Sequence, residues 1–221
     1  MNELNTLQQI TIWALPILFA ITVHEAAHGW AALQLGDQTA QRLGRVTLNP
    51  IKHIDLIGTV IVPLSMFLLS GIVFGWAKPV PVNFHQLRHP HRDMGLVAIA
   101  GPAANLLMMI FWAIIAQIGW LAYEAFAISI FLVYIGSAGI FINAILMILN
   151  LLPILPLDGG RVLHSLLPPS WAISFSKTEP FGLPILVILL LTGILQVLLT
   201  PVLYVYIIAG GYIEIIQKIL S

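Results

Sequence analysis

Two histidines and a glutamate occur at a spacing that could bind a metal ion. His24, Glu25 and His28 form the pattern His-Glu-x-x-His within an apolar run over residues 10–35. On a helix the two histidines lie one turn apart on the same face, so both imidazoles can bind one ion. Glu25 lies about 100° around the helix, where it can reach a water molecule on that ion without being a ligand. The pattern therefore predicts a metal site with a base beside it.

The surroundings of the motif favour the metal site over its main alternative. In a soluble chain these three letters recur by chance, but residues 13–23 and 29–35 are almost wholly apolar. Ionisable groups inside a membrane span are costly unless they have partners, so they indicate function. The alternative is a buried polar cluster that hydrogen-bonds neighbouring helices.

Asp158 is the candidate for a third ligand. Pro153 and Pro156 are expected to break the preceding helix, and the two glycines after Asp158 to form a sharp turn, which places Asp158 on irregular backbone. At membrane depth such backbone is tolerated only where it is buried in protein or lines a wet cavity. A carboxylate there suits a zinc site with two histidines and an open fourth position. An ion pair between Asp158 and Arg161 is the alternative.

The composition indicates a polytopic membrane protein. The 221 residues are 59% hydrophobic and only 8% charged, whereas soluble domains carry about 25% charged residues. The net charge of zero gives no support to nucleic-acid binding. The absence of cysteine excludes disulfides and thiolate metal sites. The N-terminus lacks the positive region of a signal peptide, so we expect the first helix to be retained.

Six apolar stretches must position these residues. They cover residues 9–35, 57–76, 95–122, 127–152, 182–200 and 201–218. All but the second approach or exceed the roughly 20 residues that a span needs. Pro63 and Gly71 interrupt the second. We expect an all-α fold in one membrane-embedded domain over residues 1–221, with its core at 9–165 and additional helices at 180–218.

The charges predict the topology. If residues 57–76 cross the membrane fully, the basic residues are divided between both sides, against the positive-inside rule. If this stretch enters and returns, every Lys and Arg falls on one side: Arg42, Arg45, Lys52, Lys78, Arg88, Arg92, Arg161, Lys177 and Lys218. We therefore predict five full transmembrane helices and one re-entrant or partly inserted element, with the N-terminus outside. The first and fourth stretches are then parallel, with the third antiparallel between them.

Two segments are expected to be extended near the inner face. Residues 41–55 show short alternation with β-branched residues, which predicts short strands and a turn. Residues 76–83 (WAKPVPVN) alternate proline with valine, which favours an extended edge segment. Both could pair with the unwound backbone of a substrate.

The chain resembles the site-2 proteases, a family of intramembrane zinc metalloproteases. The matching motifs are His24-Glu25-x-x-His28, Gly101-Pro102-x-x-Asn105, and Asn150-x-x-Pro153 leading to Leu157-Asp158-Gly159. Residues 48–55, Gly58-Thr59 and residues 74–83 are similar to the short prokaryotic members. The likeness covers the first four apolar stretches, and no stretch suits a PDZ or CBS domain. One departure is Leu155, where the family pattern has a second proline.

The resemblance implies roles for the candidate residues. One Zn²⁺ per chain would be held by His24, His28 and Asp158, with Glu25 as the general base. Asn150 would donate to the oxyanion, although an asparagine that hydrogen-bonds between helices is an equal alternative. Packing is the role expected for Asn105 and Asn143, and close helix approach for Gly101.

The implied function is hydrolysis of peptide bonds within or near the transmembrane segments of membrane protein substrates. The chain would work in the lipid bilayer of a prokaryotic cell, with its site toward the cytoplasm. A metal-ion transporter and a catalytically silent scaffold are the alternatives. The sequence identifies neither the natural substrate nor the oligomeric state.

The remaining histidines have simpler interpretations. His53 and His164 are candidates to line a water path, because they lie close in sequence to the two motifs around His24 and Asp158. A solvated basic loop is favoured over a second metal site for His85, His89 and His91.

Overall fold

The computed structural model describes residues 6–62, 65, 77–123, 125–126 and 128–200 of the chain. Within these residues the chain is helical and contains no strand. The α-helices are α1 (Thr6–Gln34), α2 (Thr39–Arg42), α4 (Pro90–Leu121), α5 (Ser129–Asn150), α6 (Asp158–Leu166), α7 (Pro169–Ser176) and α8 (Gly182–Leu191). Short 3₁₀ turns lie at Pro50–His53, Phe84–Gln86 and Glu179–Phe181, and a π-helical turn at Leu56–Ile61.

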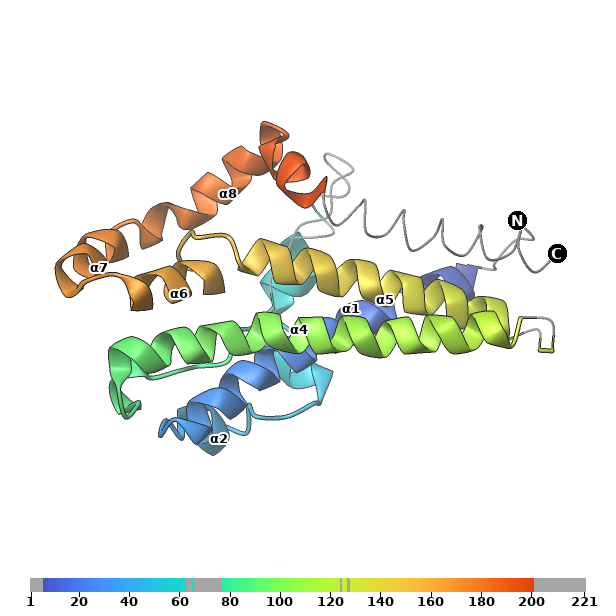
Figure 1. Ribbon diagram of the computed structural model, residues 1–221, viewed down its shortest axis with the longest axis horizontal. Helices are drawn as coiled ribbons and strands as arrows, with labels where there is room; N and C mark the ends of the chain where they lie inside the picture. Colours follow the sequence, from blue (N-terminus) through green and yellow to red (C-terminus); the bar gives the residue numbers. More distant parts are fainter. Residues whose placement is uncertain (1–5, 63–64, 66–76, 124, 127, 201–221) are drawn as a thin grey trace.

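Three long apolar helices, α1, α4 and α5, form the bundle that carries the site. They lie side by side, with α4 antiparallel to both α1 and α5 (Figure 1), as the charge pattern predicts. Segments Ile10–Gln34, Pro90–Leu121 and Ser129–Asn150 are each long and apolar enough to cross a membrane. At about 1.5 Å per residue, the shortest of them is about 33 Å long, which matches a hydrocarbon core of about 30 Å.

Glycines on α5 allow close packing against α4. A Cβ atom at Gly136 would lie 2.6 Å from the backbone nitrogen of Ala116, and one at Gly139 would collide with the ring of Trp112. Trp112 is itself buried at 3% exposure. Small residues at such a contact let two backbones approach, which drives helix association where lipid removes the hydrophobic effect.

The prediction of five full spans is wrong for the described residues, which contain three candidate spans, or four if one bent helix pair counts as one span. The stretch 182–200 is broken, because α8 ends at Leu191 and Gly193 has a left-handed φ of +78°. Glycine adopts this conformation without strain and commonly ends a helix. The stretch 201–218 lies outside the described residues, as do residues 63–64 and 66–76 of the predicted re-entrant element.

The predicted short β segments are also wrong. Within residues 41–55, the first two residues belong to α2, and Pro50–His53 form a 3₁₀ turn. The Asn49 side chain caps this turn by accepting a hydrogen bond from the Ile51 amide. Residues 77–83 form no ladder. Their backbone hydrogen bonds go to α1 and to the preceding loop, and Pro79 and Pro81 have no amide hydrogen to offer a partner strand. This stretch is called the strap below, with its continuation to Arg88.

We predict that Gly136→Leu will destabilise the bundle. The added side chain must displace the α4 backbone, and overpacking of this kind costs about 1–3 kcal/mol. The thermal unfolding midpoint in detergent should fall by several degrees. Ala113→Leu is the matched control, because Ala113 is an exposed residue of α4; an equal loss in both variants would contradict the proposed contact.

Candidate metal centre

Three potential ligand atoms converge between α1 and the start of α6. The Nε2 atoms of His24 and His28 are 3.1 Å apart. Asp158 Oδ2 lies 3.2 Å from the first and 3.3 Å from the second. Within the part of the chain that the structure describes, this is the only group of three His, Asp or Glu side chains placed to share an ion.

The triangle has the dimensions of one face of a tetrahedral zinc site. Nitrogen and oxygen ligands lie about 2.0–2.1 Å from zinc, so two ligands of a tetrahedron are about 3.3–3.4 Å apart. The three observed separations agree with this value to within a few tenths of an ångström. Asp158 Oδ2 is buried and has no hydrogen-bond partner of acceptable geometry among the described residues. A cation bound by the three atoms would satisfy it.

The charge state of Asp158 suits a ligand. Burial alone would raise the pKa of its carboxyl group, but the imidazoles of His24 and His28, when protonated, donate hydrogen bonds and place positive charge beside it, and these effects outweigh burial and lower the pKa to about 2. The group is therefore ionised at neutral pH, as a carboxylate ligand must be.

Hydrogen bonds on the far side of each ring fix the imidazoles. His24 Nδ1 donates to Asn105 Oδ1 over 2.6 Å, and His28 Nδ1 donates to the Val97 carbonyl over 2.8 Å. A carbonyl oxygen can only accept, so each proton lies on Nδ1. Both Nε2 atoms consequently face Asp158, and a metal ion that replaces their protons could bind both lone pairs.

Asn105 does more than the packing expected from the sequence. It is completely buried, and its Nδ2 donates to Asn143 Oδ1 over 2.9 Å. Asn143 in turn donates to the Gly139 carbonyl over 2.8 Å. Asn105 is therefore held in the orientation that accepts from His24. The four-residue interval from Gly101 to Asn105, which puts both on one face of α4, is the sequence signal for this role.

Gly101 provides the space for the histidines. A Cβ atom at this position would collide with His28 Nε2 and would lie 2.6 Å from the Cε1 atoms of both rings. The expectation of close helix approach at Gly101 is confirmed, and the contact is between α4 and the imidazoles of α1.

Asp158 reaches the histidines because α5 stops at Asn150. Residues 151–157 are irregular, as the prolines predict, but Asp158 is the first residue of α6 and the glycines after it are helical. The expected sharp turn is therefore wrong. A Cβ atom at Gly159 would lie 2.5 Å from the Leu152 carbonyl oxygen, so glycine lets α6 start directly against the irregular segment. This packing directs Asp158, at the start of α6, toward the histidines of α1.

The alternative ion pair with Arg161 is absent. Arg161 Nη2 lies 3.3 Å from Glu179 Oε1, and its guanidinium is 5.0 Å from the centre of the Phe84 ring. Asp158 faces the two histidines instead.

The two other predicted residues have hydrogen-bond partners outside the triangle. Glu25 is half-buried, and its Oε2 accepts a hydrogen bond of 2.7 Å from the Val80 amide. Asn150 Nδ2 donates 2.9 Å back to the Leu146 carbonyl of its own helix. The oxyanion role of Asn150 stays a prediction.

The remaining histidines do not extend the cluster. His53 is 2% exposed, and its Nε2 bonds to the Thr47 carbonyl at 2.9 Å. The rings of His91 and His164 are 5.6 Å apart, beside Leu167, whose carbonyl is 3.1 Å from His91 Nε2. His164 has a pKa below its usual value, because burial and the nearby His91 and Arg161 disfavour its charged form, against a smaller opposing effect of Glu179.

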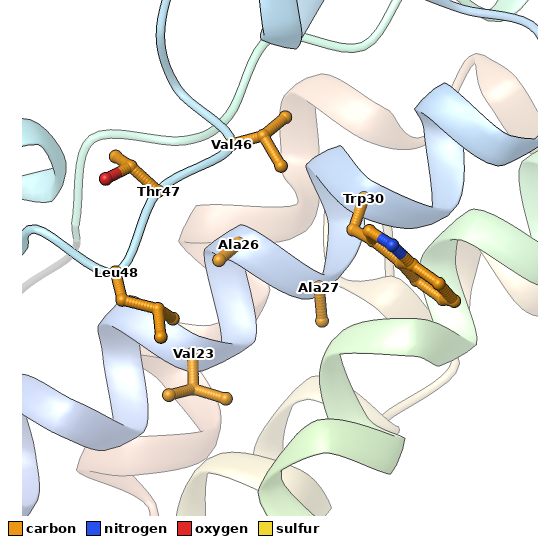
Figure 2. Close-up of a pocket in the computed structure, with 7 residues that line it drawn as sticks. All are labelled: Val23, Ala26, Ala27, Trp30, Val46, Thr47 and Leu48. Atoms are coloured by element: carbon orange, nitrogen blue, oxygen red, sulfur yellow. The ribbon is translucent and has the colours of Figure 1, made fainter.

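An apolar hollow lies on a different face of α1. It is lined by Val23, Ala26, Ala27, Trp30, Val46, Thr47 and Leu48 (Figure 2). These α1 positions repeat every three or four residues and point away from His24 and His28. The hollow contains no ionisable side chain, so it is separate from the candidate metal centre.

Comparison with known proteins gives consistent matches. The profile of peptidase family M50 matches residues 121–193, which include Asp158. YwhC of Bacillus subtilis (strain 168), which is named as a zinc metalloprotease, is 36% identical over 189 residues, or 85% of this chain and 83% of YwhC. Rip2 of Mycolicibacterium smegmatis (strain ATCC 700084 / mc(2)155), named likewise, is 30% identical over 81% of this chain and 66% of its own length. No solved structure matches the chain.

We predict that Asn105→Ala will weaken zinc binding by about 10- to 100-fold, because residues that orient a ligand contribute about this much to metal affinity. Competition with a chelator measures the change. Leu106→Ala, at the next and exposed position of α4, should leave the affinity unchanged. Equal affinity of the Asn105 variant and the wild type would show that His24 does not depend on this hydrogen bond.

Proposed function

We propose that this chain, which belongs to peptidase family M50 and is a zinc metalloprotease, hydrolyses peptide bonds within or near the transmembrane segments of other membrane proteins. The resemblance to site-2 proteases seen in the sequence is confirmed at the level of the family. The step from metalloprotease to intramembrane protease is our proposal. Residues 1–221 would act as one membrane-embedded domain.

The convergence of His24, His28 and Asp158 inside an apolar bundle carries the proposal. His24 and His28 lie within α1, and Asp158 follows the end of α5; both helices are long enough to span a membrane. A site at this depth meets the backbone of a substrate's transmembrane segment. We assign the zinc ion to these three side chains.

Zinc, when bound, polarises the scissile carbonyl and activates a water molecule. The remaining chemistry belongs to residues of the chain. His24 and His28 keep their protons on Nδ1 and present Nε2, while ionised Asp158 supplies negative charge to the site. Glu25 takes the proton of the attacking water at its carboxylate and later delivers it to the leaving amine. Glu25 follows His24 directly in the sequence, which places this base beside the ligands.

We propose a cytoplasmic orientation from the positions of the basic residues. The ends of α1 and α5 and the start of α4 lie toward one side of the bundle with α2 and α7, and the α4–α5 connection lies at the other (Figure 1). Arg42, Arg88, Arg92 and Lys177 all belong to the first side. By the positive-inside rule we assign that side to the cytoplasm of a prokaryotic cell.

We predict that Glu25→Gln will lower the rate of peptide hydrolysis by about 10²- to 10⁴-fold, the range of a general base. The variant should still hold one zinc ion per chain, because Glu25 is not a ligand in the proposed site. The measurements are zinc content and cleavage of a model transmembrane substrate in detergent.

Glu179→Gln is the matched control for this variant. It makes the same chemical change at a glutamate that is largely exposed, at 45% of its side chain, and pairs with Arg161. Retained hydrolysis in Glu25→Gln would refute the role of Glu25, and loss of zinc in that variant would refute the proposed set of ligands.

We further predict that single cysteines introduced at His85 and Tyr123 will be labelled from opposite faces of the membrane. The experiment is feasible because the chain has no native cysteine. Both residues are exposed, and they lie at opposite ends of α4. A membrane-impermeant maleimide should label His85→Cys from the cytoplasmic face and Tyr123→Cys from the outer face. Labelling of His85→Cys from outside would overturn the proposed orientation.

A further inference from the structure

One peptide group connects a buried arginine to the proposed catalytic base. We infer that Arg45 is a positioning residue: it holds the Pro79–Val80 peptide so that the Val80 amide fixes the carboxylate of Glu25. The inference rests on the proposed role of Glu25, and the resemblance to other proteases assigns nothing to Arg45.

Arg45 is buried at 8% exposure, which is unusual for an arginine. Its Nη2 donates 2.8 Å to the Lys78 carbonyl and 3.3 Å to the Pro79 carbonyl. A buried guanidinium must be compensated by acceptors, and here two successive carbonyls of the strap provide them. Arg45 is therefore committed to the backbone of the strap.

The second of these carbonyls belongs to the same peptide group as the Val80 amide. In a trans peptide the carbonyl oxygen and the amide hydrogen point in opposite directions. Arg45 bonds to the oxygen, and the amide donates 2.7 Å to Glu25 Oε2 on the other side. A cation, a peptide dipole and a carboxylate thus lie in series. The positive charge at the oxygen polarises the peptide and strengthens the amide as a donor.

Other contacts keep the strap along α1. The Lys78 amide donates 3.0 Å to the His53 carbonyl, and the Asn83 amide donates 2.7 Å to Oδ2 of the completely buried Asp37. Val80 is 7% exposed, and its Cγ1 lies 3.1 Å from where a Cβ of Gly29 would be. A residue larger than glycine at position 29 would push the strap outward.

The prolines leave Glu25 with a single nearby donor in the strap. Pro79 and Pro81 have no amide hydrogen, so Val80 supplies the only one between Lys78 and Val82. Because Glu25 already accepts this hydrogen, the Val80 amide is not available to a substrate strand. Fixing the carboxylate this way reduces its rotational freedom, which favours proton transfer at one geometry.

The test compares Arg45→Gln, Arg45→Lys and the control Arg42→Gln. Arg42 is an exposed arginine three residues away, and among the described residues its guanidinium bonds only to the Gln38 side chain. We expect Arg45→Gln to lower kcat by about 10- to 100-fold with KM and zinc content unchanged, because misplacement of a catalytic group has effects of this size. Arg45→Lys retains the charge and should restore kcat to within about threefold, and Arg42→Gln should match the wild type.

Hydrogen exchange of the Val80 amide gives a readout that does not depend on activity. In a fragment covering residues 78–82 only Lys78, Val80 and Val82 carry exchangeable amides. Exchange at Val80 should be about tenfold faster in Arg45→Gln and in Glu25→Ala, which has no side-chain acceptor, than in the wild type, and unchanged in Arg42→Gln.

These readouts separate the two proposals. Retained hydrolysis in Glu25→Gln refutes the catalytic role of Glu25, whereas exchange at Val80 tests its contact with Arg45 and Glu25 in either case. Unchanged exchange in Glu25→Ala overturns the inference even if Arg45→Gln does not fold. A folded, zinc-loaded Arg45→Lys variant with a protected Val80 amide and a kcat reduced more than tenfold would also overturn it.

Discussion

The hydrogen bond from His24 to Asn105 is the interaction on which both the bundle and the site depend. It joins α1 to α4, and the bond from Asn105 to Asn143 continues the connection to α5. In an apolar environment each of these groups would be costly without its partner, so the three helices are stable only in the register that pairs them. The same register directs His24 Nε2 toward Asp158. Helix packing and ligand orientation are therefore consequences of one polar network.

The end of α5 is the second constraint. A helix that continued past Asn150 would carry Asp158 away from the histidines at about 1.5 Å per residue. The irregular residues 151–157 instead let the chain reverse, and glycines 159 and 160 allow α6 to pack directly on that segment. Asp158, as the first residue of α6, is positioned by backbone contacts rather than by a side-chain partner. This arrangement leaves its Oδ2 free to face the two imidazoles.

The sequence predicted the features that depend on periodicity and residue type. The His-Glu-x-x-His spacing and the prolines before Asp158 correctly indicated which side chains meet, and the charge pattern correctly gave the relative directions of α1, α4 and α5. It failed where long-range contacts decide. Residues 77–83 have the composition of a strand, but their hydrogen bonds go to Glu25, Asp37 and Arg45, which local pattern cannot reveal. Likewise, the break at Gly193 depends on a left-handed backbone conformation, which the mean hydropathy of residues 182–200 does not reveal.

The rigidity of the triangle argues for catalysis over ion transport. A conduction pathway needs several binding sites along its length, each weak enough to release the ion. The described residues contain one such group, and both of its imidazoles are fixed by acceptors on α4. Fixed ligands bind an ion tightly and keep it. Beside His24, the Glu25 carboxylate is held by a backbone amide, and the role proposed for it as a base is one that transport does not require. A preorganised metal with a preorganised base is the arrangement that hydrolysis uses.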